Sequence, residues 1–184
     1  MTTIYIHGFG GSGKGVKAGL FREYYKNIDK PFLAPSLSYV PDLAITTLEE
    51  IIESYDAEVN LIGSSLGGYY SIYLASKYKL KAALINPSVY PYKTLKQVLG
   101  SAMNFYDESS FEWNEKHIYM LQKYEVLTPH EQNFMILLQK GDKLLDHTQA
   151  LQKLPNAQHI VEDGGSHSFE GIERYFEKID QFFC

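Results

Sequence analysis

The stretch Val59-Asn60-Leu61-Ile62-Gly63-Ser64-Ser65-Leu66-Gly67-Gly68 decides the fold of this chain. An apolar run leads into Gly-x-Ser-x-Gly, and a helical pattern follows, which is typical of a nucleophile elbow. Such a turn lifts the Ser65 hydroxyl clear of the sheet. It leaves no room for a Cβ at Gly63 or Gly67, because the strand folds straight back into the helix. The stretch therefore predicts a nucleophilic serine at Ser65, with an ordinary glycine-rich turn as the alternative.

The composition of the whole chain limits the classes of protein to consider. A length of 184 residues with 45% hydrophobic residues suits one folded domain, residues 1–184. The net charge of −5 argues against a general nucleic-acid or anionic-membrane surface. The one cysteine, Cys184, has no internal partner, and no signal-peptide pattern or long apolar run is present. We expect a cytoplasmic protein without stable membrane insertion, and the oligomeric state stays open.

Alternating strand and helix patterns predict an α/β fold. Four helices are predicted from apolar residues spaced three or four apart: 13–27, with Val16, Leu20, Tyr24 and Ile28 on one stripe, then 41–55, 66–78 and 169–183. Six short apolar runs predict strands: 3–7, 32–37, 59–63, 81–86, 134–139 and 158–161. Because these runs are apolar throughout, we expect a mostly parallel sheet of about six strands with helices on both faces.

The interval from about residue 87 to 133 is too long for an ordinary crossover between two strands. It is rich in tyrosine, phenylalanine and tryptophan. We interpret it as a helical cap over the carboxyl edge of the sheet, and we expect Tyr90, Trp113 and Tyr119 to line a substrate pocket together with Gly10. The alternative is that these aromatic side chains only pack the cap onto the body.

Two further residues complete a possible catalytic set with Ser65. A serine hydroxyl needs a base within hydrogen-bond reach, and the base needs an orienting carboxylate. Asp142 follows the fifth predicted strand and His167 follows the sixth, which gives the order Ser, Asp, His. Asp146 is the competing carboxylate, and we favour Asp142 because it follows the strand directly.

The loop His7-Gly8-Phe9-Gly10-Gly11-Ser12-Gly13 follows the first strand and is expected to help bind an oxyanion. The backbone N–H groups of Phe9 and Leu66 are the predicted donors. The loop also matches parts of a dinucleotide fingerprint and of a P-loop across residues 8–15. The first lacks the acidic residue after the next strand, and the second has Gly15 where a hydroxyl should bind Mg²⁺. No metal-ligand spacing is present, and no cofactor is expected.

Five ordered motifs together resemble the YqiA-like esterases of the α/β-hydrolase superfamily. They are residues 7–12 (HGFGGS), 63–70 (GSSLGGYY), 85–87 (INP), 141–146 (GDKLLD) and 164–169 (GGSHSF). The resemblance implies a compact α/β-hydrolase fold, with Ser65 as nucleophile, Asp142 as acid and His167 as base. It also implies hydrolysis of carboxylic esters or acyl-CoA thioesters through an acyl-enzyme. A ligand-binding protein on the same fold remains the alternative function, and nucleotide binding through residues 8–15 a weaker one.

Overall fold

The computed structural model describes residues 1–184 and contains a six-stranded sheet in the order β2-β1-β3-β4-β7-β8. Every neighbouring pair in this sheet is parallel, so the predicted α/β class is confirmed. The strands are β1 (Thr2–Ile6), β2 (Phe32–Leu33), β3 (Val59–Ser64), β4 (Lys81–Ile85), β7 (Phe134–Gln139) and β8 (Gln158–Glu162).

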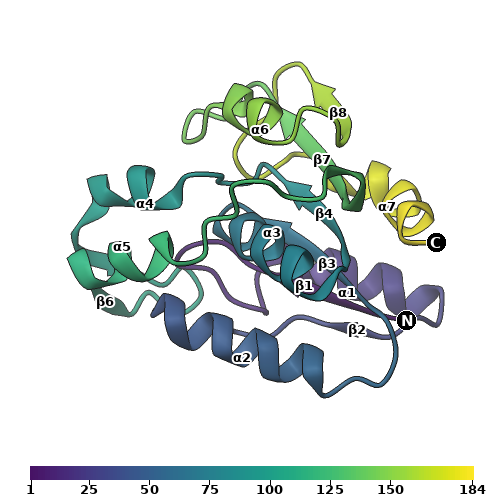
Figure 1. Cartoon of the computed structure of the whole chain (residues 1–184), viewed down its shortest axis with the longest axis horizontal. Helices are drawn as coiled ribbons and strands as arrows, with labels where there is room; N and C mark the ends of the chain where they lie inside the picture. The colour runs from purple at the N-terminus through teal and green to yellow at the C-terminus, as the bar shows by residue number, and fades with distance from the viewer.

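Helices cover both faces of this sheet (Figure 1). A core cluster of 25 buried residues joins the sheet to α2, α3 and α6, and a second cluster of 14 joins the opposite face to α1 and α7. Ile4 and Ile6 belong to the first cluster and Tyr5 to the second, which explains why each strand is apolar along its whole length. The helices are α1 (Val16–Asn27), α2 (Pro41–Glu53), α3 (Leu66–Tyr78), α6 (His147–Lys153) and α7 (Phe176–Phe183).

The buried face of α1 differs from the predicted stripe. Val16 is 84% exposed, and Ile28 lies beyond the helix. The helix instead buries Ala18, Phe21 and Tyr25. A strict four-residue spacing drifts around a helix of 3.6 residues per turn, so the predicted stripe does not stay on one face. Contacts with other elements accompany this orientation: the tilted rings of Phe21 and Phe176 have centroids 4.4 Å apart, and Tyr25 stacks on Phe32 at 5.3 Å.

Two predicted elements are shorter in the structure. Strand β2 ends at Leu33, and Pro35 just beyond it has no N–H to continue the ladder. Its place at the sheet edge agrees with the sequence reading. The C-terminal helix begins at Phe176, after the 3₁₀ turn η3 (Ile172–Tyr175), because Gly171 at φ 69° interrupts a continuous helix from residue 169.

The segment between β4 and β7 is only partly helical. It contains an antiparallel pair, β5 with β6, that the sequence reading did not predict. Figure 1 shows α4, α5 and β6 together at the side of the molecule away from both termini. The elements are α4 (Pro91–Thr94), η1 (Leu95–Val98), β5 (Gly100–Met103), β6 (Ser110–Trp113), α5 (Glu115–Gln122) and η2 (Glu131–Asn133).

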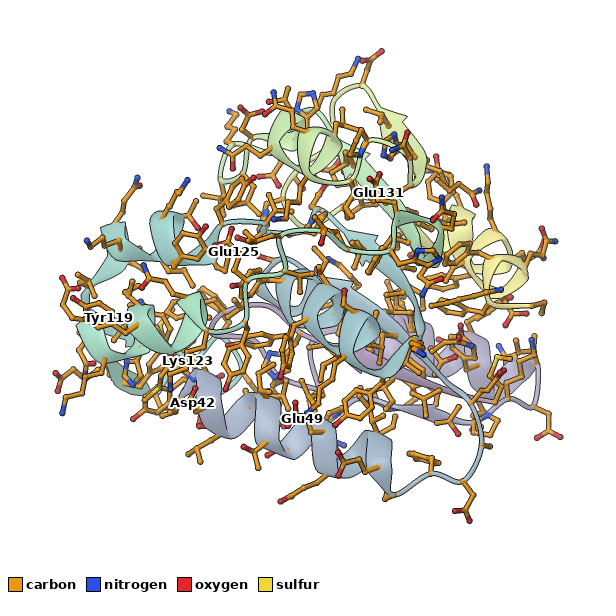
Figure 2. All side chains as sticks on the ribbon, viewed as in Figure 1. Asp42, Glu49, Tyr119, Lys123, Glu125 and Glu131 are labelled. Carbon is orange, nitrogen blue, oxygen red and sulfur yellow. The ribbon has the colours of Figure 1, made fainter.

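Side-chain contacts attach this segment to the body of the protein. Asp42 of α2 accepts hydrogen bonds from Lys123 Nζ at 2.7 Å and Tyr124 Oη at 2.8 Å. Figure 2 shows Asp42 and Lys123 where α2 and α5 come together. At the other side, the N–H of Phe105 donates to the carbonyl of Gly10 at 2.7 Å. The hairpin therefore lies against the glycine loop that follows β1. None of the helices combines the length and apolar character that a membrane-spanning segment requires.

Candidate active site

Ser65 lies in the turn between β3 and α3 with φ 55° and ψ −119°. Residues other than glycine rarely adopt this backbone conformation. A Cβ on Gly67 would lie 2.0 Å from the carbonyl oxygen of Ile6, and one on Gly63 would lie 2.3 Å from Ser71 Oγ. Both glycines are therefore required by close packing of β1, β3 and α3. The turn has the geometry that the sequence predicted for a nucleophile elbow.

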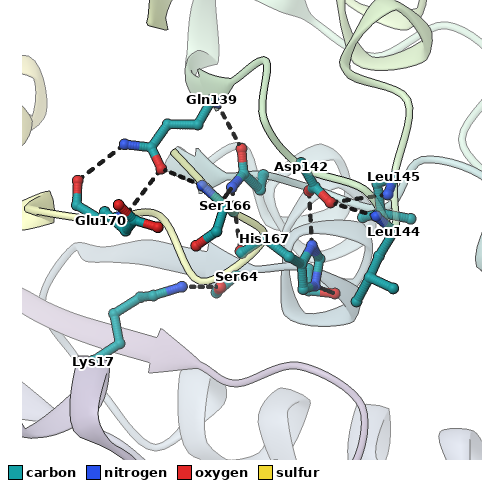
Figure 3. Close-up of polar contacts among 11 residues, drawn as sticks. Lys17, Ser64, Gln139, Asp142, Leu144, Leu145, Ser166, His167 and Glu170 are labelled. Atoms are coloured by element: carbon teal, nitrogen blue, oxygen red, sulfur yellow. Dashed lines mark hydrogen bonds and ion pairs between the residues drawn. The ribbon is translucent and has the colours of Figure 1, made fainter. Parts of the chain in front are cut away.

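The structure brings Ser65, His167 and Asp142 together. His167 Nε2 lies 3.0 Å from Ser65 Oγ. Nδ1 of the same ring lies 2.7 Å from Asp142 Oδ2 (Figure 3). The Asp142 side chain is only 3% exposed, and its other oxygen accepts the N–H groups of Leu144 and Leu145 at 2.8 and 3.0 Å. A carboxylate held in this way keeps the proton of His167 on Nδ1, and Nε2 can then accept from the Ser65 hydroxyl.

Asp146, the competing carboxylate, has a different place. It is the N-cap of α6, where its side chain accepts from the N–H of Thr148 at 2.9 Å and from the Thr148 hydroxyl at 2.7 Å. These two hydrogen bonds lower the pKa of Asp146. It makes no hydrogen bond with His167, so the geometry favours Asp142 for the orienting position.

A polar network behind the His167 loop was not found by sequence reasoning. Gln139 is buried, and its Oε1 accepts the N–H groups of Ser166 at 3.0 Å and Glu170 at 2.8 Å (Figure 3). Asn86 donates from Nδ2 to the carbonyls of Ser166 and His167 at 2.9 and 3.2 Å, and its Oδ1 accepts the N–H of Gln139 at 2.9 Å. The two amides fix the backbone on both sides of His167. The available signal was a polar residue at the end of each of two apolar strands.

The glycine loop passes directly over the elbow. A Cβ on Gly8 would lie 3.1 Å from Ser65 Cβ. His7 fixes the loop, because its Nδ1 is 2.8 Å from the carbonyl of Gly8 and its Nε2 accepts the N–H of Leu37 at 3.0 Å. Burial lowers the pKa of His7, which agrees with a neutral ring in this bridging position. The N–H groups of Phe9 and Leu66, the predicted oxyanion donors, donate to no loop carbonyl and no side chain.

Two cavities lie next to the elbow, and Ser65 lines only the larger one. The larger, of about 480 Å³, is lined by Ser65 and His167 together with residues of the glycine loop, α1 and η3. The smaller, of about 220 Å³, lies between the glycine loop, α3 and β6. Phe9 lines both cavities. A volume of a few hundred Å³ is in the range of small-molecule sites.

Of the four predicted pocket residues, only Gly10 lines one of the two cavities. Gly10 lines the smaller cavity. Trp113 is fully buried, donates from Nε1 to the carbonyl of Leu95 at 3.1 Å and packs against Phe9 at 4.9 Å between ring centroids. Tyr90 lines neither cavity, and Tyr119 is 63% exposed on the outer side of α5 (Figure 2). The cavities are lined instead by aromatic residues that the sequence reading did not select: Tyr39, Tyr70, Phe105, Phe111 and Phe169.

No group of three or more His, Cys, Asp or Glu side chains is placed to hold a metal ion. One charged residue at the site was missed from the sequence. Lys17 lines the larger cavity, and its Nζ donates to Ser64 Oγ at 2.7 Å. Its only signal in the sequence was a position four residues past Gly13, near the start of the helix predicted for residues 13–27.

Comparison with solved structures defines the fold class as α/β-hydrolase. Alpha/beta hydrolase domain-containing protein 10 from mouse superposes with a TM-score of 0.77 at 18% identity, covering 98% of this chain and 88% of that one. Est1E from Butyrivibrio proteoclasticus, with ferulic acid bound, also gives 0.77, at 13% identity over 98% of this chain and 87% of that one. An alpha/beta superfamily hydrolase from Oenococcus oeni PSU-1 gives 0.68, at 17% identity over 100% and 92%.

Within this fold, the chain belongs to the uncharacterised protein family UPF0227, whose model matches residues 2–184. A UPF0227 protein of Pasteurella multocida (strain Pm70) is 24% identical over 185 residues, which cover 97% of each chain. A UPF0227 protein of Vibrio vulnificus (strain CMCP6) is 21% identical over 184 residues, again 97% of each. The predicted resemblance to the YqiA-like group is thus confirmed at the level of the family and the fold.

Proposed function

We propose that this protein is a serine hydrolase that cleaves carboxylic esters or acyl-CoA thioesters through an acyl-enzyme intermediate. The observation that carries the proposal is the continuous line of hydrogen bonds from Ser65 through His167 to Asp142, at 3.0 and 2.7 Å. These residues come from three loops far apart in the sequence. If Ser65 served only to form the turn, nothing would require an imidazole beside its hydroxyl and a nearly buried carboxylate beside that imidazole.

The proposed reaction follows from the geometry. His167 Nε2 takes the proton of Ser65 as Oγ attacks the acyl carbonyl. The N–H groups of Leu66 and Phe9 bind the oxyanion that forms, a contribution that is typically worth about 3 kcal/mol for each donor. His167 then gives its proton to the leaving alcohol or thiol. Water repeats the sequence on the acyl-enzyme, and Asp142 stabilises the imidazolium in both halves.

The comparisons support the hydrolase class. Similar folds belong to proteins described as hydrolases and esterases, and Est1E binds ferulic acid. Ferulic acid is a carboxylic acid, which is the kind of product that ester hydrolysis releases. The choice between oxygen esters and thioesters, and the location in the cytoplasm, remain predictions from the sequence.

A fluorophosphonate probe provides the direct test, because it phosphonylates only a serine that an adjacent base activates. We expect stoichiometric labelling, located at Ser65 by mass spectrometry, and none in Ser65→Ala. A panel of p-nitrophenyl esters of graded length and acyl-CoA thioesters would then identify the acyl group. A folded wild-type protein that is neither labelled nor active on this panel would contradict the proposal, and ligand affinity equal in wild type and Ser65→Ala would favour a binding protein.

A further inference from the structure

Lys17 places an ammonium group beside the elbow. The residue lies in the first turn of α1, and its Nζ donates to Ser64 Oγ at 2.7 Å (Figure 3). Both side chains line the larger cavity. Ser64 immediately precedes Ser65, and Ser65 and His167 line the same cavity as Lys17. The ammonium group therefore borders the cavity in which a substrate attached to Ser65 would lie.

No carboxylate of the protein neutralises this charge. Lys17 takes part in none of the ion pairs of the structure. Asp142 is committed to His167 and to two backbone N–H groups. Glu173 is exposed at the rim of the cavity and lies beyond ion-pair distance. A neutral hydroxyl at Ser64 is the one partner of the ammonium.

The surroundings of Lys17 disfavour an unpaired cation. Burial lowers the pKa of Lys17 to about 8, a fall that the more distant Asp142 only partly opposes. The first turn of α1 contains no acidic residue, and the N-terminal end of a helix is its positive end. A half-desolvated ammonium in such a place becomes more stable when an anion enters the cavity. Serine hydrolysis itself does not require this cation, because the oxyanion is assigned to backbone N–H groups.

We propose, on the basis of the esterase function above, that Lys17 is a specificity residue that binds a carboxylate of the substrate. The preferred substrates are then esters that carry a second, anionic group, either in the acyl half or in the alcohol half. The cavity of about 480 Å³ is in the volume range of sites that bind small molecules. The ammonium keeps its bond to Ser64 or exchanges it for the carboxylate, a stronger charge-assisted bond.

Two pairs of esters test this proposal, because in each pair a carboxylate replaces one methyl group. Monoethyl glutarate and ethyl pentanoate differ in the acyl half, and O-butyryl glycolate and ethyl butyrate differ in the alcohol half. We expect wild-type protein to favour the charged member of at least one pair. Lys17→Met should lower kcat/KM for that ester by roughly 10- to 100-fold, mainly through KM, and change the neutral ester by less than about threefold.

Three controls separate charge recognition from support of the elbow. Lys17→Arg keeps the charge and should retain most of the preference. Lys14→Met removes the same charge from an exposed position that lines neither cavity, and should leave the preference unchanged. Lys17→Gln provides a second neutral variant if the methionine variant is unstable. An equal loss on both esters of a pair would instead assign Lys17 a structural role beside Ser64.

The outcomes distinguish this inference from the function on which it rests. Labelling of Ser65 and turnover of the neutral esters, with no preference for either charged ester or with a preference that survives Lys17→Met, would overturn the role of Lys17 alone. Absence of both labelling and turnover would overturn the esterase function, and this inference with it.

Discussion

Gln139 should control the position of His167 without touching Ser65. The replacement Gln139→Met nearly preserves the shape of the side chain but removes both polar atoms. The carboxamide oxygen now accepts the N–H groups of Ser166 and Glu170, at 3.0 and 2.8 Å. The nitrogen donates to Glu162 Oε2 at 2.7 Å and to the carbonyl of Glu170 at 2.9 Å. Four hydrogen bonds around His167 are lost in a single replacement.

The structure gives an approximate size for the loss. A buried backbone N–H without an acceptor costs about 1–3 kcal/mol. Ser166 is half-buried and Glu170 is exposed, so water replaces part of each bond and the lower end of that range applies to both. We therefore expect a loss of about 2 kcal/mol, or roughly 4–8 °C in Tm for a chain of this length. Because a shift of about 1 Å in a catalytic group can lower a rate 100-fold, we expect kcat to fall by about 10- to 100-fold with little change in KM.

The assay compares thermal melting with kcat on a neutral butyrate ester for wild type, Gln139→Met and Gln152→Met. Gln152 is exposed on α6 and makes no side-chain hydrogen bond, so its replacement controls for the change of residue type. A fall in Tm with kcat within twofold of wild type would show that the network supports only the fold. That result would refute the positioning role.

Gln139→Glu adds a test that depends on pH. It keeps oxygens that can accept from the loop but places a second carboxyl group against Glu162 Oε2. Like charges so close cannot both ionise, so one of the two carboxyls takes a raised pKa in the folded state. A raised folded pKa gives stability that is present at low pH and is lost as the pH rises. The variant should melt near wild type at about pH 5 and several degrees below it at about pH 8; a constant difference would contradict this account.

Three further predictions concern the elbow, the two aspartates and the dependence of stability on pH in the acid range. Ser65→Gly should abolish activity yet raise Tm by about 2–4 °C, because glycine relieves about 1 kcal/mol of backbone strain at φ 55°; no gain over Ser65→Ala would count against strain. Asp142→Asn should lower kcat roughly 10³- to 10⁴-fold, whereas Asp146→Ala should keep kcat within twofold and lose about 1 kcal/mol of stability; the reverse ranking in kinetic and melting assays would exchange their roles. Hydrogen bonds from Gln139, Tyr175 and Arg174 lower the pKa of Glu162 to about 2, so its contribution is present above about pH 4 and fades as the pH falls toward 2. Glu162→Gln should therefore be less stable than wild type at pH 7 and nearly equal to it near pH 2, and a difference independent of pH in melting curves would contradict this.

The elements that were predictable from sequence are those fixed by short-range sterics or by burial on two faces. Gly63 and Gly67 could be assigned because a tight strand-to-helix turn excludes a Cβ, whatever surrounds it. The strands could be assigned because both sheet faces are covered. The buried face of α1 could not, because Leu20 and Tyr24 are as apolar as Phe21 and Tyr25. Only contacts made in the folded chain select between these two stripes, because Phe21 packs against Phe176 and Tyr25 stacks on Phe32.

The lining of the cavities depends on the same long-range information. Trp113 was a reasonable pocket residue by composition, but β6 pairs with β5 and turns its ring inward against Phe9. The hairpin itself has little sequence signal, since Gly100–Met103 contains neither β-branched residues nor a strict alternation. The aromatic content of the interval could therefore predict a cap but not which of its side chains face the cavities.

Strand register explains why the hydrogen-bond network around His167 was not predicted, although Asn86 and Gln139 stand out in the sequence as polar residues at the ends of apolar strands. Asn86 and Gln139 each end a strand, which on the sequence indicates only the edge where a sheet meets solvent. The parallel register places Ile85 opposite Leu137 and Gln139 opposite Glu162. That register brings Asn86, Gln139 and Glu162 side by side, directly under the loop that carries His167. A shift of one residue would turn Gln139 to the other face of the sheet, so the positioning of the base depends on pairing that no single segment of the sequence specifies.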